Sequence, residues 1–234
     1  MTGAVIFFLA GALVLAGALG AHSIALRILG AWMGLALVVI ASAYALNKPG
    51  LLMKNAGGSL PLHAWFILGP FLFANHLLLL LRRTFSTEQA AHEIVPRLWL
   101  GRWPGFDGVR KLRAAGIRSI LDLTCEFPRR PALDAGAAYL NLGVLDYTPP
   151  NPEQLRRAVA FISDRLPIGP VYVHCAVGHG RGAMVVAAWL VASGRERHVS
   201  QAVALVRSRR SRVRLTRAQQ RALRAFVESH DHEG

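Results

Sequence analysis

The segment 171–182 combines residue types that could bind and attack a phosphate group. An apolar strand ends at Cys175, a loop with Gly178 and Gly180 follows, and Arg181 begins an apolar helix. Such a loop can turn its backbone N–H groups toward an anion, and the helix adds its positive N-terminal end. Arg181 can bind two phosphate oxygens with its planar guanidinium. The same electropositive surroundings favour the thiolate of Cys175, so a nucleophile, an oxyanion cradle and a cation would meet at one phosphorus atom.

The structural alternative for this segment is a buried core cysteine and a surface arginine, because a bare Cys-x5-Arg spacing is common. The full pattern is more specific, since His174 precedes the cysteine, a glycine stands three residues after it, and an apolar strand and an apolar helix flank the loop. This combination favours the chemical interpretation. We therefore predict a phosphate-binding loop made of Ala176, Val177, Gly178, His179, Gly180 and Arg181.

Short strands alternate with amphipathic helices around this loop, from about residue 90 onward. The predicted strands are 97–100, 117–123, 139–142 and 171–173. The predicted helices are 106–115, 151–166, 180–193, 199–209 and 217–229. Alternation at this spacing is typical of an α/β fold, in which helices cover a sheet. The predicted loop would lie between the fourth of these strands and the helix that follows it.

The run from His174 to Arg181 resembles the signature of the cysteine-dependent protein tyrosine phosphatase superfamily, in its dual-specificity branch. Further landmarks of that family follow in the expected order at 94–101, 116–126 and 145–150. The resemblance covers about residues 94–230. It implies a mainly parallel sheet flanked by helices, with the signature loop joining a central strand to a helix.

The resemblance also implies a general acid, an aspartate on a loop before the signature. Asp146 stands at the matching position, 29 residues before Cys175. Asp122, inside a predicted strand, and Asp134, after an apparent loop, are rival acids. The implied mechanism is attack of Cys175 on phosphorus, protonation of the leaving oxygen by Asp146, and hydrolysis of the phosphocysteine by water that Asp146 activates. Arg181 and the loop amides would hold the phosphate oxygens throughout.

Three residues outside the loop have indirect roles to consider. His174 would orient the loop and tune the thiolate. Gly182 stands where the family usually has serine or threonine, whose hydroxyl helps the thiolate to leave in the second step. A slow second step is therefore predicted, and a pseudophosphatase adaptor that only binds phosphate is an alternative. Cys125 could protect Cys175 through a disulfide, as such a cysteine does in some superfamily members, or it could be a buried strand-end residue. No metal and no cofactor is expected.

Composition separates the N-terminal third from this catalytic region. The 234 residues are 53% hydrophobic yet carry a net charge of +14, and residues 1–81 contain three basic residues and no acidic one. Residues 82–234 contain the other 24 basic residues and all 13 acidic ones. A single water-soluble globule and a disordered chain are both excluded. We predict an α-helical membrane region of about three spans, each able to cross about 30 Å of hydrocarbon, near 3–21, 28–46 and 61–81.

These features predict an integral, multi-pass membrane protein with a membrane region at 1–87 and a dual-specificity phosphatase-like catalytic domain at 88–234. A cleaved signal peptide is the alternative for the first span. No basic residue precedes that span and two further spans follow it, so we favour a membrane anchor.

Lysine and arginine near the ends of the spans predict their orientation. Arg27 is placed in the turn between the first two spans, and Arg82 and Arg83 close the third, so all three would lie on one side of the membrane. Lys48 and Lys54 would lie on the other side. Because basic residues favour the cytoplasmic side, the catalytic domain is predicted to be cytoplasmic.

The substrate class is left open between two kinds of enzyme. The resemblance implies hydrolysis of phosphotyrosine, phosphoserine and phosphothreonine in proteins. Ten arginines lie between residues 195 and 224, with Glu196 as the only acid there, and such a surface would attract anionic headgroups of a phospholipid or inositol lipid. The expected partners are a phosphorylated protein or an anionic phospholipid, and the membrane. Membrane tethering makes a nucleic acid an unexpected partner.

Overall fold

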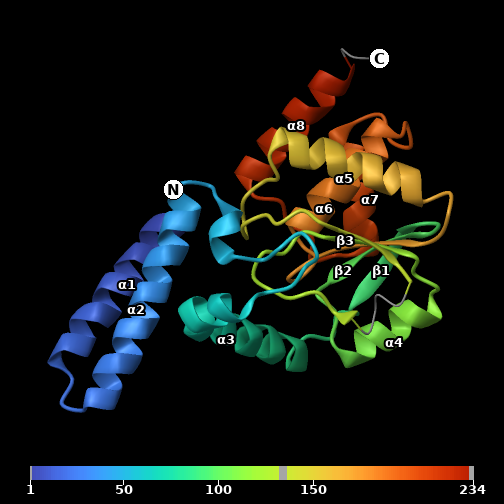
Figure 1. Cartoon of the computed structure of the whole chain (residues 1–234). Coiled ribbons are helices and arrows are strands. Elements are labelled where there is room, and N and C mark those ends of the chain that lie inside the picture. The colour runs from blue at the N-terminus through green and yellow to red at the C-terminus, as the bar shows by residue number, and fades with distance from the viewer. Residues whose placement is uncertain (1, 132–135, 232–234) are drawn as a thin grey trace. The chain divides into compact units, whose positions relative to one another are not determined.

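The computed structural model describes residues 2–131 and 136–231 (Figure 1). The chain divides into two compact units, one made of Met1–Ser86 with Cys125–Pro128 and the other of Thr87–Thr124 with Arg129–Gly234. Asp134, one of the candidate acids, lies outside the described residues.

The first unit is built mainly of apolar helices, namely α1 Thr2–Gly20, α2 Ile24–Ala45, the short 3-10 helix η1 Pro49–Leu52 and α3 Leu62–Thr84. Helices α1, α2 and α3 are long and apolar enough to cross a membrane, by length and composition. Large apolar side chains such as Leu13, Leu19 and Phe66 are at least 75% exposed. Water is a poor solvent for so much apolar surface, whereas lipid would cover it. The predicted α-helical region of about three apolar segments is confirmed.

The prediction that Arg27 lies in the turn between the first two spans is wrong. Helix α2 begins at Ile24 and takes Arg27 into its first turn. The Arg27 Nε donates a hydrogen bond to the carbonyl of Ala21, 2.7 Å away. The long side chain therefore reaches back to the end of the helix, as arginines near span ends do. Its charge stays at the connection between α1 and α2.

The second unit is an α/β fold around a five-stranded sheet. Its elements in chain order are β1 Ala91–Val95, β2 Leu98–Arg102, α4 Phe106–Ala114, β3 Ser119–Asp122, β4 Ala138–Asn141, α5 Pro152–Arg165, β5 Val171–Cys175, α6 Arg181–Ala192, α7 Val199–Arg209 and α8 Arg217–Asp231. The strand order is β1-β2-β5-β3-β4, with β1 antiparallel to β2 and the other pairs parallel. The predicted mainly parallel sheet flanked by helices is confirmed, and β5 lies at its centre.

Alternate side chains of the strands face two separate cores. Val171 and Val173 of β5 point into the larger core, which they share with α5, α6, α7 and α8. Tyr172, between them, belongs to a smaller core with Val109 and Leu112 of α4. Figure 1 shows α4 on one side of the sheet and the other four helices on the opposite side. Burial of both faces explains the continuous apolar sequence of the strand that leads to Cys175.

Local signals fix the ends of the helices around the site. Asn151 and Gln154 form a capping box at the start of α5, with Pro152 at the first helical position. Gly116 and Gly194 follow α4 and α6 with φ angles of +67° and +70°. A glycine adopts this left-handed conformation without strain, so both helices end where the sequence predicts.

Candidate active site

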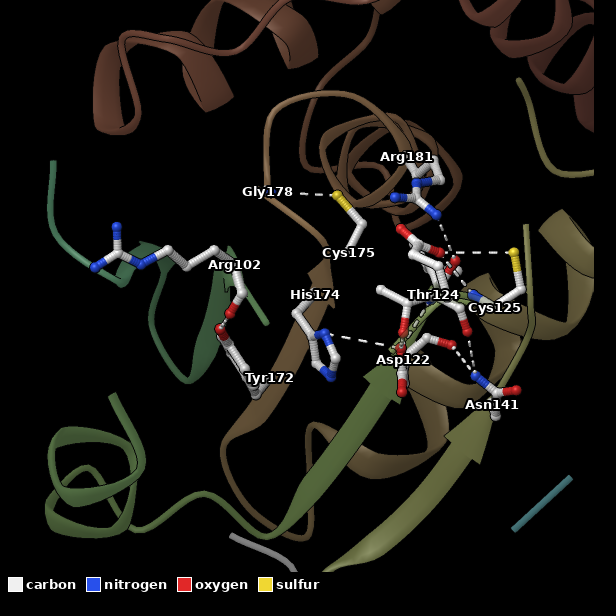
Figure 2. Close-up of polar contacts among 12 residues, drawn as sticks. Arg102, Asp122, Thr124, Cys125, Asn141, Tyr172, His174, Cys175, Gly178 and Arg181 are labelled. Carbon is white, nitrogen blue, oxygen red and sulfur yellow. Dashed lines mark hydrogen bonds and ion pairs between the residues drawn. The ribbon is translucent and has the colours of Figure 1, made fainter. Parts of the chain in front are cut away.

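Cys175 ends the central strand, at the edge of the sheet where the parallel strands have their carboxyl ends. It pairs with Arg102 of β2, and the preceding His174 pairs with Asp122 of β3. Cys175 is 1% exposed, and its Sγ accepts a hydrogen bond from the Gly178 N–H at 3.2 Å (Figure 2). The backbone after the strand therefore curls around the sulfur. Cys175 and Cys125 are both buried, and each is a thiol and not half of a disulfide.

The five carbonyls of residues 176–180 all accept hydrogen bonds from groups outside the loop. The Ala176 carbonyl accepts from the Trp103 N–H at 3.1 Å, and those of Val177 and Gly178 accept from the Arg210 guanidinium at 2.9 and 3.0 Å. The His179 carbonyl accepts from the Arg214 N–H at 3.0 Å, and the Gly180 carbonyl from the Met184 N–H at 2.8 Å. In a trans peptide the C=O and the next N–H point in opposite directions. The N–H groups of residues 177–181 are therefore directed away from these donors. This is the backbone arrangement that an anion-binding loop requires.

Gly178 and Gly101 allow the loop to lie directly against β2. Gly178 has a φ of +74°, and a Cβ there would overlap the carbonyl of Gly101. A Cβ at Gly101 would overlap the carbonyl of Ala90 and lie 2.5 Å from the hydroxyl of Tyr172. Both positions therefore require glycine, one for its backbone conformation and both for space.

Arg181 begins α6, yet its side chain is fully buried. Its Nη1 donates to the carbonyl of Val144 at 2.7 Å and to that of Leu123 at 3.3 Å. Its Nη2 lies 3.1 Å from a carboxylate oxygen of Asp146. These contacts hold the guanidinium within the unit, so the alternative of a surface arginine is excluded.

Asp146 and Asp122, the two candidate acids that the structure describes, lie in different environments. The Asp146 side chain is 40% exposed and faces Arg181. Asp122 is 0% exposed, and its carboxylate accepts hydrogen bonds from the Thr124 N–H at 2.8 Å, the Thr124 hydroxyl at 2.7 Å and the Tyr139 hydroxyl at 2.7 Å. A carboxylate engaged in this way holds the ends of strands together and is closed to a substrate.

His174 lies beside Asp122, beneath the start of the loop. It is 3% exposed, its ring stacks on Tyr172 with 5.3 Å between centroids, and its Nδ1 is 3.8 Å from Asp122 Oδ1 (Figure 2). The Tyr172 hydroxyl in turn donates to the carbonyl of Arg102 at 2.5 Å. This packed series of side chains supports the end of β5, where Cys175 begins the loop.

Gly182 lies in the first turn of α6, as the sequence predicts, and it is buried. A Cβ at this position would lie 3.8 Å from the backbone nitrogen of Cys175 but only 2.9 Å from Cδ1 of Leu100. The site for a hydroxyl is therefore next to Cys175, but it is more crowded than the sequence indicates. The end of the Leu100 side chain must move before serine can fit.

His179 turns away from the loop toward an acid near the start of the second unit. Its Nε2 lies 2.7 Å from Oε2 of Glu88. Burial lowers the pKa of His179 below the ordinary 6.5, and the hydrogen bond with Glu88 opposes this shift. A neutral His179 donates its Nε2–H to the carboxylate.

Three other residues near the site escape the sequence analysis. Arg210 holds two loop carbonyls, and Glu88 contacts it at 2.9 Å. Burial lowers the pKa of Arg210 below its ordinary value, and Glu88 opposes that shift. Gln219 lies next to Gly180 and donates to the carbonyl of Thr148, in the turn that follows Asp146, at 3.0 Å. Arg210 is hidden among the arginines of the C-terminal region, and no local pattern marks Glu88 or Gln219.

Comparison with solved structures gives the same fold. PTPMT1 in complex with PI(5)P has a TM-score of 0.57 and 21% identity, and the match covers 62% of this chain and 99% of that one. Human DUSP28 has a TM-score of 0.54 and 21% identity, and the match covers 61% of this chain and 99% of DUSP28. Tk-PTP in its active form has a TM-score of 0.53 and 27% identity, and the match covers 59% of this chain and 97% of Tk-PTP.

Comparison of sequences gives the family. The protein 067L of Invertebrate iridescent virus 3, which is named as a tyrosine phosphatase, is 31% identical over 110 residues, or 44% of this chain. The match spans 46% of that relative, less than half of its length. Residues 104–232 match the family described as PTP-SAK, Swiss Army Knife protein, DSP-PTPase phosphatase domain. The resemblance to dual-specificity phosphatases is thus confirmed, and this chain belongs to the PTP-SAK family of DSP-PTPase phosphatase domains.

Proposed function

We propose that this protein is a membrane-anchored, cysteine-dependent phosphatase that hydrolyses phosphomonoesters through a phosphocysteine intermediate. The loop of residues 176–181 carries the proposal. Its five carbonyls are held from outside, so the N–H groups face the opposite way, with Cys175 at one end and Arg181 at the other. Donors fixed in this way stabilise the charge that develops on equatorial oxygens without having to reorganise.

In the first step, Cys175 Sγ forms a bond to phosphorus while the bond from phosphorus to the leaving oxygen breaks. The loop N–H groups and Arg181 hold the other three oxygens. Because Nη1 of Arg181 is occupied by the carbonyls of Leu123 and Val144, we expect Nε and Nη2 to form the two-pronged contact with phosphate. Asp146 gives its proton to the leaving oxygen.

In the second step, water attacks phosphorus and the bond between sulfur and phosphorus breaks. Asp146, now a carboxylate, takes a proton from that water. Cys175 leaves as a thiolate and inorganic phosphate is released. No group in this part of α6 supplies the usual hydroxyl, because residue 182 is glycine.

Asp146→Asn is expected to slow hydrolysis of alkyl phosphates by about 10²-fold and to affect activated aryl phosphates much less, because only the poor leaving group needs a proton. The ion pair of Asp146 with Arg181 adds a second expectation. Phosphate must compete with this carboxylate for Nη2, so the variant should have a lower KM. Kinetics over a series of leaving groups provide the measurement, with the exposed Asp164→Asn as control. An equal loss for all leaving groups would remove Asp146 from the role of acid.

Gly182→Ser is expected to raise the steady-state rate. In the wild type, rapid mixing with an aryl phosphate should release a burst of phenol close to one equivalent of enzyme, followed by slower turnover. Serine should shrink that burst, since its hydroxyl can donate to the departing thiolate. Gly182→Ala is the matched control, because it has the same contact with Leu100 but no hydroxyl. If serine and alanine behave alike, the missing hydroxyl does not limit the second step.

The same measurement addresses the pseudophosphatase alternative. A protein that only binds phosphate shows neither burst nor turnover, while phosphate and vanadate still bind to its loop. In that case the proposal of an enzyme fails and the adaptor is left.

We propose phosphorylated tyrosine, serine or threonine side chains of proteins as the substrates. The naming of the viral relative as a tyrosine phosphatase supports this choice. The loop also lacks an extra cation for a second phosphate, since His179 is turned to Glu88 and burial lowers its pKa. A neutral side chain there adds little affinity for the multiply charged headgroup of an inositol lipid.

An anionic phospholipid is the second candidate substrate, supported by the charge of the C-terminal helices. No acidic residue occurs from 197 to 227, and eight exposed arginines lie there, at Arg197, Arg207, Arg209, Arg212, Arg214, Arg217, Arg221 and Arg224. A groove beside α7 and α8 is lined by Val203 and Leu223 with Arg207 and Arg224. Such a surface attracts anionic headgroups. PTPMT1, which has this fold, was crystallised with PI(5)P.

One comparison separates the two substrate classes. The full chain, reconstituted in vesicles, would be assayed with phosphotyrosine and phosphothreonine peptides and, separately, with a phosphatidylinositol monophosphate or phosphatidic acid in the same bilayer. Higher kcat/KM for peptides supports the first proposal. Activity confined to the lipids, at equal aryl phosphatase activity, would establish the second.

We also propose that the catalytic unit faces the cytoplasm. Arg82 and Arg83 lie in the last turn of α3, and Arg27 reaches back to the connection between α1 and α2. If all three helices span, these charges lie on one side, with Lys48 and Lys54 on the other. The side with more basic residues is normally cytoplasmic. Protease access to the catalytic unit in sealed vesicles of known orientation tests this assignment.

A further inference from the structure

Glu88 lies shortly after α3, the third of the long apolar helices, and is nevertheless part of the surroundings of the loop. Helix α3 ends at Thr84, and the second unit begins at Thr87. The Glu88 side chain is 10% exposed, and its Oε2 lies 2.9 Å from Nη2 of Arg210 and 2.7 Å from Nε2 of His179. His179 belongs to the loop itself. The segment that follows the membrane helices therefore contacts the phosphate-binding loop directly.

Arg210 joins this segment to the loop a second time. A guanidinium has five N–H groups, and the structure provides five acceptors for them. The Arg210 Nε donates to the carbonyl of Gly178 at 3.0 Å. Its Nη2 donates to the carbonyl of Val177 and to Glu88 Oε2, both at 2.9 Å. Its Nη1 donates to the carbonyl of Gln89 at 3.1 Å and to His92 Nδ1 at 3.0 Å. Three acceptors thus come from residues 88–92 and two from the loop.

The carboxylate of Glu88 makes the burial of this cation possible. The Arg210 side chain is fully buried, and the nearby Arg102 is also positive. A buried charge without its partner is strongly unfavourable, so loss of the Glu88 charge would draw the guanidinium out of its place. The carbonyls of Val177 and Gly178 would then lose their donors. Because the direction of each carbonyl sets that of the next N–H, the anion-binding face of the loop would lose its order.

We propose that Glu88 is a positioning residue of the phosphate-binding loop, which it holds in its anion-binding form through Arg210 and His179. The inference rests on the proposed function of that loop as a phosphate site. It makes the first residues of the second unit a part of the active-site scaffold, so the phosphatase domain would work fully only with residues 88–92 in place.

The test compares Glu88→Gln with wild type as full chains in detergent. Glutamine keeps the shape and one acceptor oxygen but removes the charge. We expect the dissociation constant for vanadate to rise about tenfold, as for the loss of one or two hydrogen bonds, with a similar rise in KM for an aryl phosphate. The ratio of rates for aryl and alkyl phosphates should not change, because Asp146 is untouched.

The matched control is Glu93→Gln, five residues further along the same segment. Glu93 is exposed and accepts the N–H of Arg97 at 2.7 Å. Its vanadate affinity and KM should equal those of wild type. A purely structural role of Glu88 would lower the fraction of folded enzyme and hence the maximal rate, but would leave KM and the vanadate constant unchanged. That result would overturn the proposal.

A second pair of variants covers the case in which Glu88→Gln does not fold. Arg210→Lys retains the charge but cannot reach five acceptors, whereas Arg209→Lys changes an exposed neighbour. Weaker vanadate binding in Arg210→Lys but not in Arg209→Lys supports the proposal. Equal vanadate binding in the two variants contradicts it. Vanadate affinity is measured by direct titration, so the comparison holds even if wild type shows no turnover, which would refute only the proposed enzyme activity.

Discussion

Cys175→Ser is expected to abolish turnover of an aryl phosphate and to leave phosphate or vanadate binding measurable. A serine hydroxyl is a much weaker nucleophile than a thiolate at neutral pH, so the rate should fall by about four orders of magnitude or more, as when other covalent enzymes lose their nucleophile. The loop should survive the change, because its carbonyls are held by Trp103, Arg210, Arg214 and Met184 and not by the sulfur.

Steady-state kinetics and phosphate titration on the same preparations provide the measurement. Cys125→Ser is the matched control, since Cys125 is the second of the two cysteines and is also buried. It should retain most of the activity. Normal hydrolysis by Cys175→Ser would remove the assignment of the nucleophile, and loss of phosphate binding along with turnover would indicate that the loop had collapsed.

Arg181→Lys is expected to lower kcat by about 10²- to 10³-fold, the usual effect of removing one preorganised donor to a developing charge. Lysine keeps the positive charge but has no planar fork. It also cannot hold the carbonyls of Leu123 and Val144 while reaching toward the phosphate, as Nη1 and Nη2 of Arg181 do. The exposed Arg157→Lys on α5 is the control. Unchanged kcat and KM in Arg181→Lys would contradict the two-pronged contact.

The local part of the site could be predicted from the sequence because its determinants are adjacent along the chain. Segment 171–182 contains the strand, the two glycines and the start of the helix, and each has its own signature. Asp146 required the family resemblance. Its contact with Arg181 depends on the turn after β4, which no periodicity predicts.

The residues that support the loop could not be predicted, because their contacts join positions far apart in the sequence and no local pattern marks them. Glu88 and Arg210 are 122 positions apart, and nothing local distinguishes Arg210 from the exposed arginines around it. The strand β1, which the sequence analysis misses, shows the same limit. Of its five residues only Ile94 is buried, so this edge strand has no apolar alternation. The charge of Arg27 predicts that the second span begins after it, whereas α2 begins at Ile24 and the long Arg27 side chain reaches back to the carbonyl of Ala21.

The most direct test of the account is capture of the phosphocysteine. The wild-type chain would be mixed with an aryl phosphate, quenched in acid within the burst and digested for mass spectrometry. We predict one phosphoryl group on the peptide that contains Cys175, in an amount close to the phenol released, and none in Cys175→Ser. Continued turnover with the phosphoryl group on another residue, or with no phosphorylated peptide although a burst is seen, would contradict the proposed mechanism.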